Sequence, residues 1–201
     1  MATDSYRLAE KTINLAAKSD GQANFIVPAR TMAEIGRLID PSIEKVAINV
    51  GENQVEFKLG PTEVVSRLIE GSFPDYQQII PTNIKTKTEL NTTEFANAIK
   101  MASFFARESA NNIKLKIKKP KSIQVLAVSP QIGDNISDLE AAFEGDETEI
   151  AFNAKFILDA LAVIGTEKVS LELSGPLAPG VIRPAKDNNY LYIIMPLRME
   201  E

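Results

Sequence analysis

The sequence contains no cysteine and no histidine. Without cysteine it can form neither a disulfide framework nor a thiolate metal site, which is typical of proteins in a reducing cytoplasm. Without histidine it lacks the commonest general base and metal ligand. No apolar run approaches the roughly 20 residues needed to cross a bilayer, and Asp4 stands where a signal peptide would be basic or apolar. These absences lead us to expect a soluble, cytoplasmic protein.

The composition is that of a globular protein. Hydrophobic residues make up 44% of the 201 positions, enough for a substantial core in one or two domains. The formal net charge is −5, which excludes a simple polycation. A local basic patch inside an acidic protein is still compatible with binding to nucleic acid.

An internal repeat organises the chain. Each copy has a short apolar run, a residue that favours a helix start, and then an apolar pattern with helical spacing. The three start residues, Pro28, Asn91 and Asn153, are 63 and 62 residues apart. Apolar residues recur four, ten and eleven positions after each start. Those at four positions are Met32, Phe95 and Ile157. The three matching segments are 25–39, 88–102 and 150–164.

Alternating apolar and polar residues follow each predicted helix, as expected for half-buried antiparallel strands. The repeat is therefore strand, helix, strand, strand, strand, and it predicts an α+β fold with helices on one side and antiparallel sheets on the other. Residues 2–15 match only the last strand of a repeat, so we expect the chain to begin within a domain. The predicted strands are 45–50, 55–59, 62–70, 112–117, 123–128, 138–143, 168–173 and 190–198.

The segment 71–81 connects the first repeat to the second. Pro74 and Pro81 favour a stiff extended connector, because proline fixes its own backbone and restricts the residue before it. Phe73, Tyr76 and Ile79 make this connector apolar, which indicates packing against both neighbours. The alternative is an ordinary loop with a few buried anchors. We place the domain boundary here, with a partial domain over 1–80 and a complete one over 81–201.

Several stretches together resemble the bacterial sliding clamp, the beta subunit of DNA polymerase III. They are Ala2-Thr3-Asp4-Ser5-Tyr6-Arg7-Leu8-Ala9, Glu70-Gly71-Ser72-Phe73-Pro74-Asp75-Tyr76, Phe152-Asn153 and Tyr192-Ile193-Ile194-Met195-Pro196-Leu197-Arg198-Met199. The resemblance covers nearly the whole chain and implies the DNA clamp fold. It also implies that the chain corresponds to the second half of the clamp's middle domain and to its entire last domain.

In that family, helices line the central hole of a ring that slides on duplex DNA. Five basic residues on the predicted helices lie off the apolar stripe. Their ordinary interpretation is a solvated helix face. The resemblance implies that they face DNA and contact phosphates without regard to sequence. These residues are Arg30, Arg37, Lys100, Arg107 and Lys155.

The resemblance further implies a hydrophobic pocket that binds short linear peptides from DNA polymerase and clamp-loader subunits. At the carboxyl end, Ile193, Met195 and Leu197 alternate with other residues, and the edge of such a strand would offer apolar surface to an extended peptide. The alternative for these residues is core packing. The implied pocket residues are Thr3, Tyr6, Arg7, Leu8, Pro74, Ile79, Asn153, Phe156, Leu177, Pro179, Ile193, Met195, Pro196, Leu197 and Arg198.

An enzymatic function is a further alternative. Five acidic residues cluster around Gly145, and such clusters can bind magnesium or act as paired carboxylates. The sequence has no Gly-rich phosphate loop beside them, so we interpret them as a solvated acidic loop. We expect a non-enzymatic processivity factor of DNA replication, with no cofactor and no metal. The alternative is a peptide-docking or structural repeat module that does not bind DNA.

The sequence also predicts self-association. The segment 2–15 is expected to be an orphan strand whose sheet neighbours are absent, and exposed edges recruit further strands. A two-fold dimer is the simplest result, and a closed ring of four chains is the larger alternative.

Overall fold

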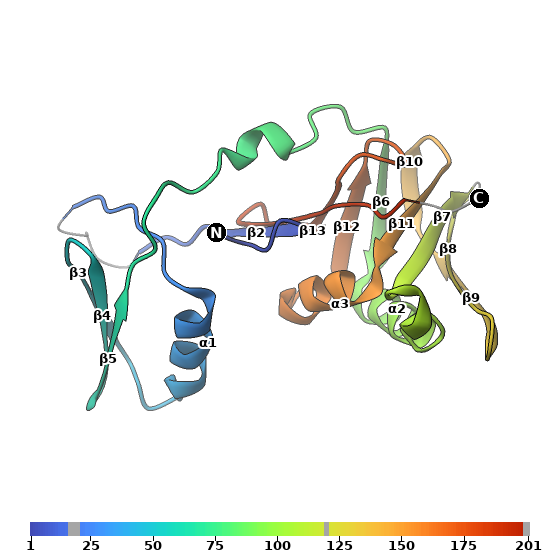
Figure 1. Cartoon of the computed structure of the whole chain (residues 1–201). Coiled ribbons are helices and arrows are strands. Elements are labelled where there is room, and N and C mark those ends of the chain that lie inside the picture. The colour runs from blue at the N-terminus through green and yellow to red at the C-terminus, as the bar shows by residue number, and fades with distance from the viewer. Residues whose placement is uncertain (16–20, 119–120, 199–201) are drawn as a thin grey trace. The chain divides into compact units, whose positions relative to one another are not determined.

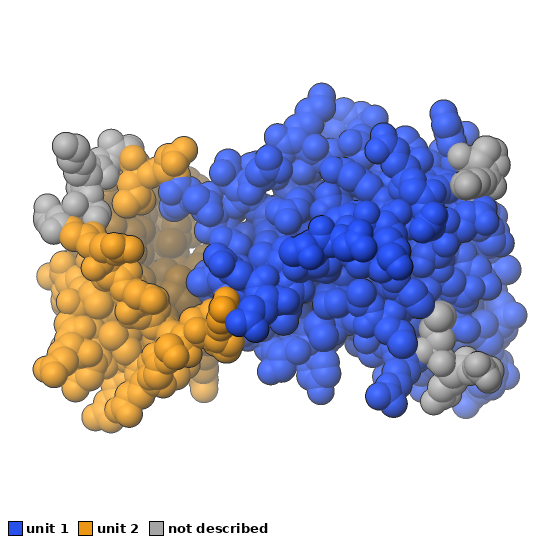
Figure 2. Space-filling model, turned by 90° about the horizontal axis from the view of Figure 1, so that it is seen from above, with its two compact units in different colours: residues 1–13, 76–201 blue, residues 14–75 orange. Residues whose placement is uncertain are grey.

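The computed structural model describes residues 1–15, 21–118 and 121–198 (Figure 1). The chain divides into two compact units (Figure 2). Unit 1 comprises residues 1–13 and 76–201, and unit 2 comprises residues 14–75. None of the helices in the described ranges is long and apolar enough to cross a membrane.

Unit 1 contains two antiparallel sheets. The larger has the strand order β1-β2-β14-β13-β12-β6-β10, and the smaller has the order β11-β7-β8-β9. Both the first and the last strands of the chain therefore belong to one sheet. The strands of the larger sheet are β1 (Ala2–Thr3), β2 (Arg7–Lys11), β6 (Thr86–Asn91), β10 (Ala142–Gly145), β12 (Lys168–Leu173), β13 (Gly180–Pro184) and β14 (Tyr190–Ile194). Those of the smaller sheet are β7 (Asn112–Lys118), β8 (Ser122–Ser129), β9 (Gly133–Glu140) and β11 (Thr148–Asn153).

Two helices of unit 1, α2 (Thr92–Phe105) and α3 (Ala154–Val163), contact each other and pack over a shared core. Both begin at an asparagine cap, a position where a side-chain oxygen satisfies the free N–H groups of the first turn. The side chain of Asn91 accepts hydrogen bonds from the N–H groups of Thr93 and Glu94, and that of Asn153 accepts one from Lys155. Short 3-10 helices lie at Tyr76–Ile79 (η1) and Arg107–Ser109 (η2).

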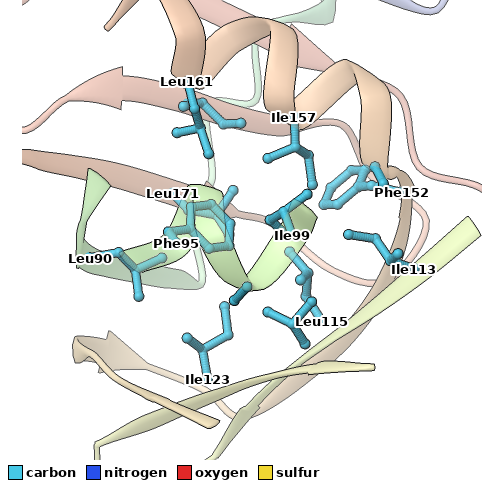
Figure 3. Close-up of a cluster of buried hydrophobic side chains, with 14 of the residues drawn as sticks. Leu90, Phe95, Ile99, Ile113, Leu115, Ile123, Phe152, Ile157, Leu161 and Leu171 are labelled. Carbon is cyan, nitrogen blue, oxygen red and sulfur yellow. The ribbon is translucent and has the colours of Figure 1, made fainter. Parts of the chain in front are cut away.

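The core of unit 1 joins residues from both helices and both sheets (Figure 3). Phe95 and Ile99 of α2 and Ile157 of α3 are fully buried beside strand residues such as Leu115 and Phe152. Burying an apolar side chain of this size stabilises the fold by about 1.5–3 kcal/mol. The helices are therefore fixed to the sheets through the apolar stripe that the sequence repeats.

The second and third repeats are joined reciprocally within unit 1. The opening strand of the second repeat, β6, pairs with β12 of the third, and the opening strand of the third, β11, pairs with β7 of the second. The last segment of each repeat also pairs with the opening strand of the same repeat. Phe143 of β10 pairs opposite Thr88 of β6, and the N–H of Leu197 donates to the carbonyl of Ala151 at 2.8 Å.

Gly145 marks a close approach between the end of β10 and the chain before β6. Its φ is +101°, and a Cβ at this position would lie 1.9 Å from the carbonyl oxygen of Lys85. Only glycine fits such a backbone without a shift of the main chain. This contact closes the second repeat.

Unit 2 contains the first repeat. Helix α1 (Ala29–Leu38) precedes a three-stranded sheet of order β3-β4-β5, formed by Val46–Val50, Gln54–Leu59 and Thr62–Arg67. Its buried core is small and consists of Ile35, Val55, Phe57 and Leu59, with five partly buried apolar residues around it. The end of the repeat returns to its opening run here too, because the N–H of Ile69 donates to the carbonyl of Ile26 at 2.8 Å.

The repeat and the α+β fold are confirmed, while several details of the strand predictions are wrong. Residues 2–15 do not form an orphan strand, because β2 pairs with β14 on one edge and with the short β1 on the other. The predicted strand 138–143 breaks at Ala141, where the chain passes from one sheet to the other. The connector 71–81 is not uniformly extended, since it contains η1. Strand β13 was not predicted.

Candidate functional site

The pairing of β2 with β14 brings the two ends of the chain together within unit 1. Leu8 lies opposite Ile193, and Arg7 lies opposite Ile194. Beyond the last ladder pair, the N–H of Met195 donates to the carbonyl of Tyr6 at 2.9 Å. The predicted pocket residues of the first strand therefore lie beside those of the carboxyl end.

A tight turn joins β1 to β2 and fixes the residues around Arg7. One carboxylate oxygen of Asp4 accepts hydrogen bonds from the N–H groups of Tyr6 and Arg7, each at 3.1 Å. The hydroxyl of Thr3 donates to the carbonyl of Arg7 at 2.8 Å. Ser5 has a φ of 74°, in the left-handed region that costs an L-residue about 1–2 kcal/mol. The surrounding hydrogen bonds hold this turn in place.

Arg7 is the centre of a polar cluster. Its Nη1 donates to Asp159 of α3 at 2.5 Å and to the hydroxyl of Tyr192 at 3.3 Å, while its Nε donates to Asp4 at 2.9 Å. The guanidinium also lies 4.4 Å from the centroid of the Phe156 ring, within cation–π range. The Arg7 side chain is therefore held by residues from three elements.

The cluster changes the pKa values of its members. Partial burial alone would raise the pKa of Asp159, but hydrogen bonds from Arg7 and Lys155 outweigh it and lower that pKa. Burial alone would also raise the pKa of Asp4, but the interaction with Arg7 outweighs it and lowers that pKa. Burial raises the pKa of Tyr192, although the hydrogen bond from Arg7 opposes the change. At neutral pH the cluster thus contains two cations, Arg7 and the Lys155 that pairs with Asp159, together with two carboxylates and a neutral phenol.

Two hollows of unit 1 contain predicted pocket residues. One, of about 250 Å³, is lined by Thr3, Asp4, Arg7 and Tyr192 with two alanines. The other, of about 610 Å³, is lined by residues that include Ile79 with its chain neighbours and Pro179. The stacked rings of Tyr6 and Phe156, with centroids 6.4 Å apart, add an aromatic surface beside Arg7.

The strand-edge argument for the carboxyl end is wrong. Strand β14 lies between β2 and β13, and Ile193 is only 1% exposed. Leu8 is buried in the same way. These two residues belong to the core and are not accessible to a ligand. Met195, at 38% exposure, is accessible to a ligand.

The other predicted pocket residues differ in their surroundings. Leu177 and Ile79 are exposed, Pro196 and Leu197 are partly buried, and Arg198 is exposed. Asn153 caps α3, and its amide also donates to the carbonyl of Ala110 at 3.1 Å, so both ends of its side chain are occupied. Pro74 is exposed and belongs to unit 2. Met199 lies outside the described residues.

The five basic residues predicted to face DNA are all exposed. Arg37 pairs with Glu34, Lys155 pairs with Asp159, and Arg107 lies over the ring of Phe104. Arg107 belongs to η2 and not to a regular helix. Arg30 and Lys100 form no ion pair with any residue in the described ranges.

Sequence reasoning missed Asp4, Asp159 and Tyr192 as partners of Arg7. The only local signal was the spacing of Lys155 and Asp159, which lie four residues apart on α3 and form an ion pair at 2.9 Å. The acidic residues near Gly145 are distributed over β9, β10, β11 and the turn between the last two, and Glu149 pairs with Lys116 at 3.0 Å. Across the described part of the chain, no three acidic side chains come together as a metal-binding group.

Family models match both parts of the chain. Residues 1–75 match the central domain of the DNA polymerase III beta subunit, and residues 77–198 match its C-terminal domain. The chain is 37% identical to the beta sliding clamp of Bacillus subtilis over 199 residues, which is 98% of this chain and 53% of that protein. It is 34% identical to the beta sliding clamp of Staphylococcus aureus, with 98% and 52% covered.

Solved structures give the same result. The crystal structure of the Bacillus subtilis DNA polymerase sliding clamp superimposes with a TM-score of 0.93 at 36% identity, over 99% of this chain and 53% of that one. The Thermotoga maritima DNA polymerase III beta subunit gives a TM-score of 0.88 at 28% identity, over 99% and 54%. The chain thus spans about half the length of these relatives. It has the α+β clamp fold and belongs to the DNA polymerase III beta subunit family, the beta sliding clamps.

Proposed function

We propose that the chain acts in DNA replication as a portion of a sliding clamp. In this role it binds short linear peptides of DNA polymerase and clamp-loader subunits at the surface around Arg7 and Met195. The observation that carries the proposal is the pairing of β2 with β14, which assembles that surface from residues at opposite ends of the chain.

The chemistry of the surface suits a peptide with apolar side chains. Tyr6 and Phe156 provide an aromatic wall next to the fixed cation of Arg7. Met195 adds an unbranched, polarisable side chain that can adapt to related sequences. Because Asp4 and Asp159 together neutralise Arg7 and Lys155, the site would select ligands by apolar shape more than by charge.

The same proposal gives the basic residues of the helices a role toward duplex DNA. Arg30 and Lys100, which lack ion pairs in the described ranges, are the side chains most available for phosphate contacts. Contacts of this kind carry no sequence information, as a sliding protein requires. The chain is therefore expected to bind DNA weakly and in a salt-dependent manner.

Fluorescence polarisation tests the peptide site directly. The probe is a labelled peptide containing a glutamine followed by a leucine and a Leu-Phe pair, and we expect saturable binding with a micromolar Kd. Met195→Ala should weaken binding by about 1–2 kcal/mol, which is roughly 5- to 30-fold. Met101→Ala is the matched control, because Met101 is also exposed but lies on α2. Absence of saturable binding into the high micromolar range would refute the proposal.

A further inference from the structure

The hollow that contains Ile79 and Pro179 extends beyond the predicted peptide pocket. It has a volume of about 610 Å³, and its lining residues come from two segments of unit 1, 78–85 and 174–179. Among these lining residues, Ile79 and Pro179 alone belong to the predicted pocket. The remaining part of the hollow can therefore accept residues that lie outside the peptide motif.

The hollow adjoins the surface around Met195. Gly180, the first residue of β13, pairs opposite Ile194, the last residue of β14. Because the two strands are antiparallel, Pro179 and Met195 each lie one residue beyond this pair at the same end of the sheet. Neighbouring strands are about 4.8 Å apart. A peptide bound at Met195 is therefore near enough for its flanking residues to enter the hollow.

The hollow combines an apolar wall with polar groups. Thr82, Asn83 and Lys85 lie beside the wall, and all three are exposed. Their side chains carry O–H or N–H donors, and none of these side chains is hydrogen-bonded or ion-paired to a residue in the described ranges. A carboxylate, which only accepts hydrogen bonds, suits a site rich in donors. The apolar residues are Ile79, Ile80, Pro81, Ala178 and Pro179.

Lys85 gives the hollow its charge. Among the described residues, it is the only charged one in the lining. Its main chain is fixed on both sides, because its N–H donates to the carbonyl of Leu173 at 2.9 Å and its carbonyl accepts from the N–H of Asp146 at 3.1 Å. Lys87 differs, since it pairs with Glu172 at 3.2 Å. An unpaired cation at a fixed position, with no carboxylate in the same lining, attracts an anionic group.

We propose that this hollow binds an acidic residue that flanks the motif of a bound peptide, and that Lys85 determines the preference for that residue. The carboxylate of the peptide pairs with Lys85, and the adjoining main chain lies against the apolar wall. This inference rests on the proposed peptide site. It adds a charge preference that the cluster around Arg7 cannot supply, because Asp4 and Asp159 neutralise the cations there.

The expected size of the preference follows from the exposure of Lys85. An exposed ion pair changes a dissociation constant by roughly 2- to 5-fold. It also weakens as salt is added, because exposed charges are screened. Apolar contacts at the motif do not share this salt dependence, so the two contributions can be measured separately.

Fluorescence polarisation with three labelled peptides tests the inference on the 201-residue chain. All three contain the glutamine, leucine and Leu-Phe motif. One has glutamates before the motif, one has glutamates after it, and the neutral peptide has glutamines on both sides. We expect one acidic peptide to bind roughly 2- to 5-fold more tightly than the neutral one, with a gain that shrinks as salt is added. If neither acidic peptide gains while the neutral peptide binds, the inference is overturned and the peptide site stands.

Variants then assign the gain to Lys85. Lys85→Met should remove it, and Lys85→Glu should reverse it, so that a peptide with lysines in place of the glutamates binds more tightly than the acidic one. The ratio of acidic to neutral Kd within each variant removes any general effect on the site. Lys87→Met is the matched control, because the Lys87 side chain is 51% exposed but already paired, and it should keep the gain.

The remaining outcomes are also decisive. A gain that survives in Lys85→Met, or one that Lys87→Met loses equally, overturns the role of Lys85. Circular dichroism checks that the variants are folded. Failure of the neutral peptide to bind refutes the peptide site itself and the inference with it.

Discussion

The ion pair between Arg7 and Asp159 provides a quantitative test of the cluster at the candidate peptide site. Arg7→Met keeps the length of the side chain and removes the charge, and Asp159→Asn keeps the shape of the carboxylate. The two side chains are 24% and 39% exposed, so the pair lies between a surface and a buried ion pair. The double variant completes a double-mutant cycle.

The expected magnitudes follow from this intermediate position. Exposed ion pairs contribute about 0.2–1 kcal/mol, whereas hydrogen bonds to charged groups contribute about 1.5–3 kcal/mol when buried. We therefore expect a coupling free energy of about 1 kcal/mol between Arg7 and Asp159. Arg7→Met should cost about 2 kcal/mol in total, because it also removes the Asp4 bond and the cation–π contact, worth about 0.5–1 kcal/mol.

Urea and thermal unfolding followed by circular dichroism would measure these free energies, with each unit's transition fitted separately. A loss of about 2 kcal/mol corresponds to a decrease in Tm of roughly 4–8 °C for a protein of this size. The control cycle is Arg37→Met with Glu34→Gln, a more exposed ion pair on α1. If the Arg7–Asp159 coupling is no larger than that of the control, our description of Arg7 as the centre of the cluster is wrong.

Three further predictions concern pH, the core and DNA. Because the pKa of Asp159 is lowered, its ion pair stabilises the fold fully above about pH 4, and this stabilisation is lost as the pH falls further. Asp159→Asn should therefore flatten the acid limb of a pH–stability curve measured by urea unfolding. Phe95→Ala should cost about 3–5 kcal/mol in thermal unfolding, whereas truncation of the exposed Phe104 on the same helix should cost far less. DNA binding measured by fluorescence anisotropy should be independent of DNA sequence and should decrease steeply with salt. It should disappear when three basic residues are replaced together. These residues are Arg30, Arg37 and Lys100. A tight, sequence-dependent complex would contradict the sliding function.

The sequence predicted the fold through features that are local. The helix starts at Asn91 and Asn153 are confirmed as caps, because a cap requires only a few neighbouring residues. The alternation in 45–50 and 168–173 gave strands that match β3 and β12 within one residue. Pro28 also precedes a helix, although it has no side chain that can accept a capping hydrogen bond.

Features that depend on distant pairing could not be predicted in this way. Alternation shows which face of a strand is apolar, but it does not show whether the edge of the strand is free. The position of Ile193 in the interior of a sheet was therefore missed. The break at Ala141 was missed for the same reason, since alternation does not record which sheet a residue joins. Two partners of Arg7, Asp159 of α3 and Tyr192 of β14, lie more than a hundred residues away along the chain.

The pairing of β2 with β14 also has a consequence for synthesis on the ribosome. Lys11 pairs with Tyr190, so about 180 residues must be translated after the second strand before its partner exists. At 5–20 residues per second this delay is roughly 9–36 s. Unit 2 and both helices of unit 1 are translated during that interval. Throughout it, Leu8 lacks its cross-strand neighbour Ile193, and β2 must wait for β14 before this part of the sheet can form.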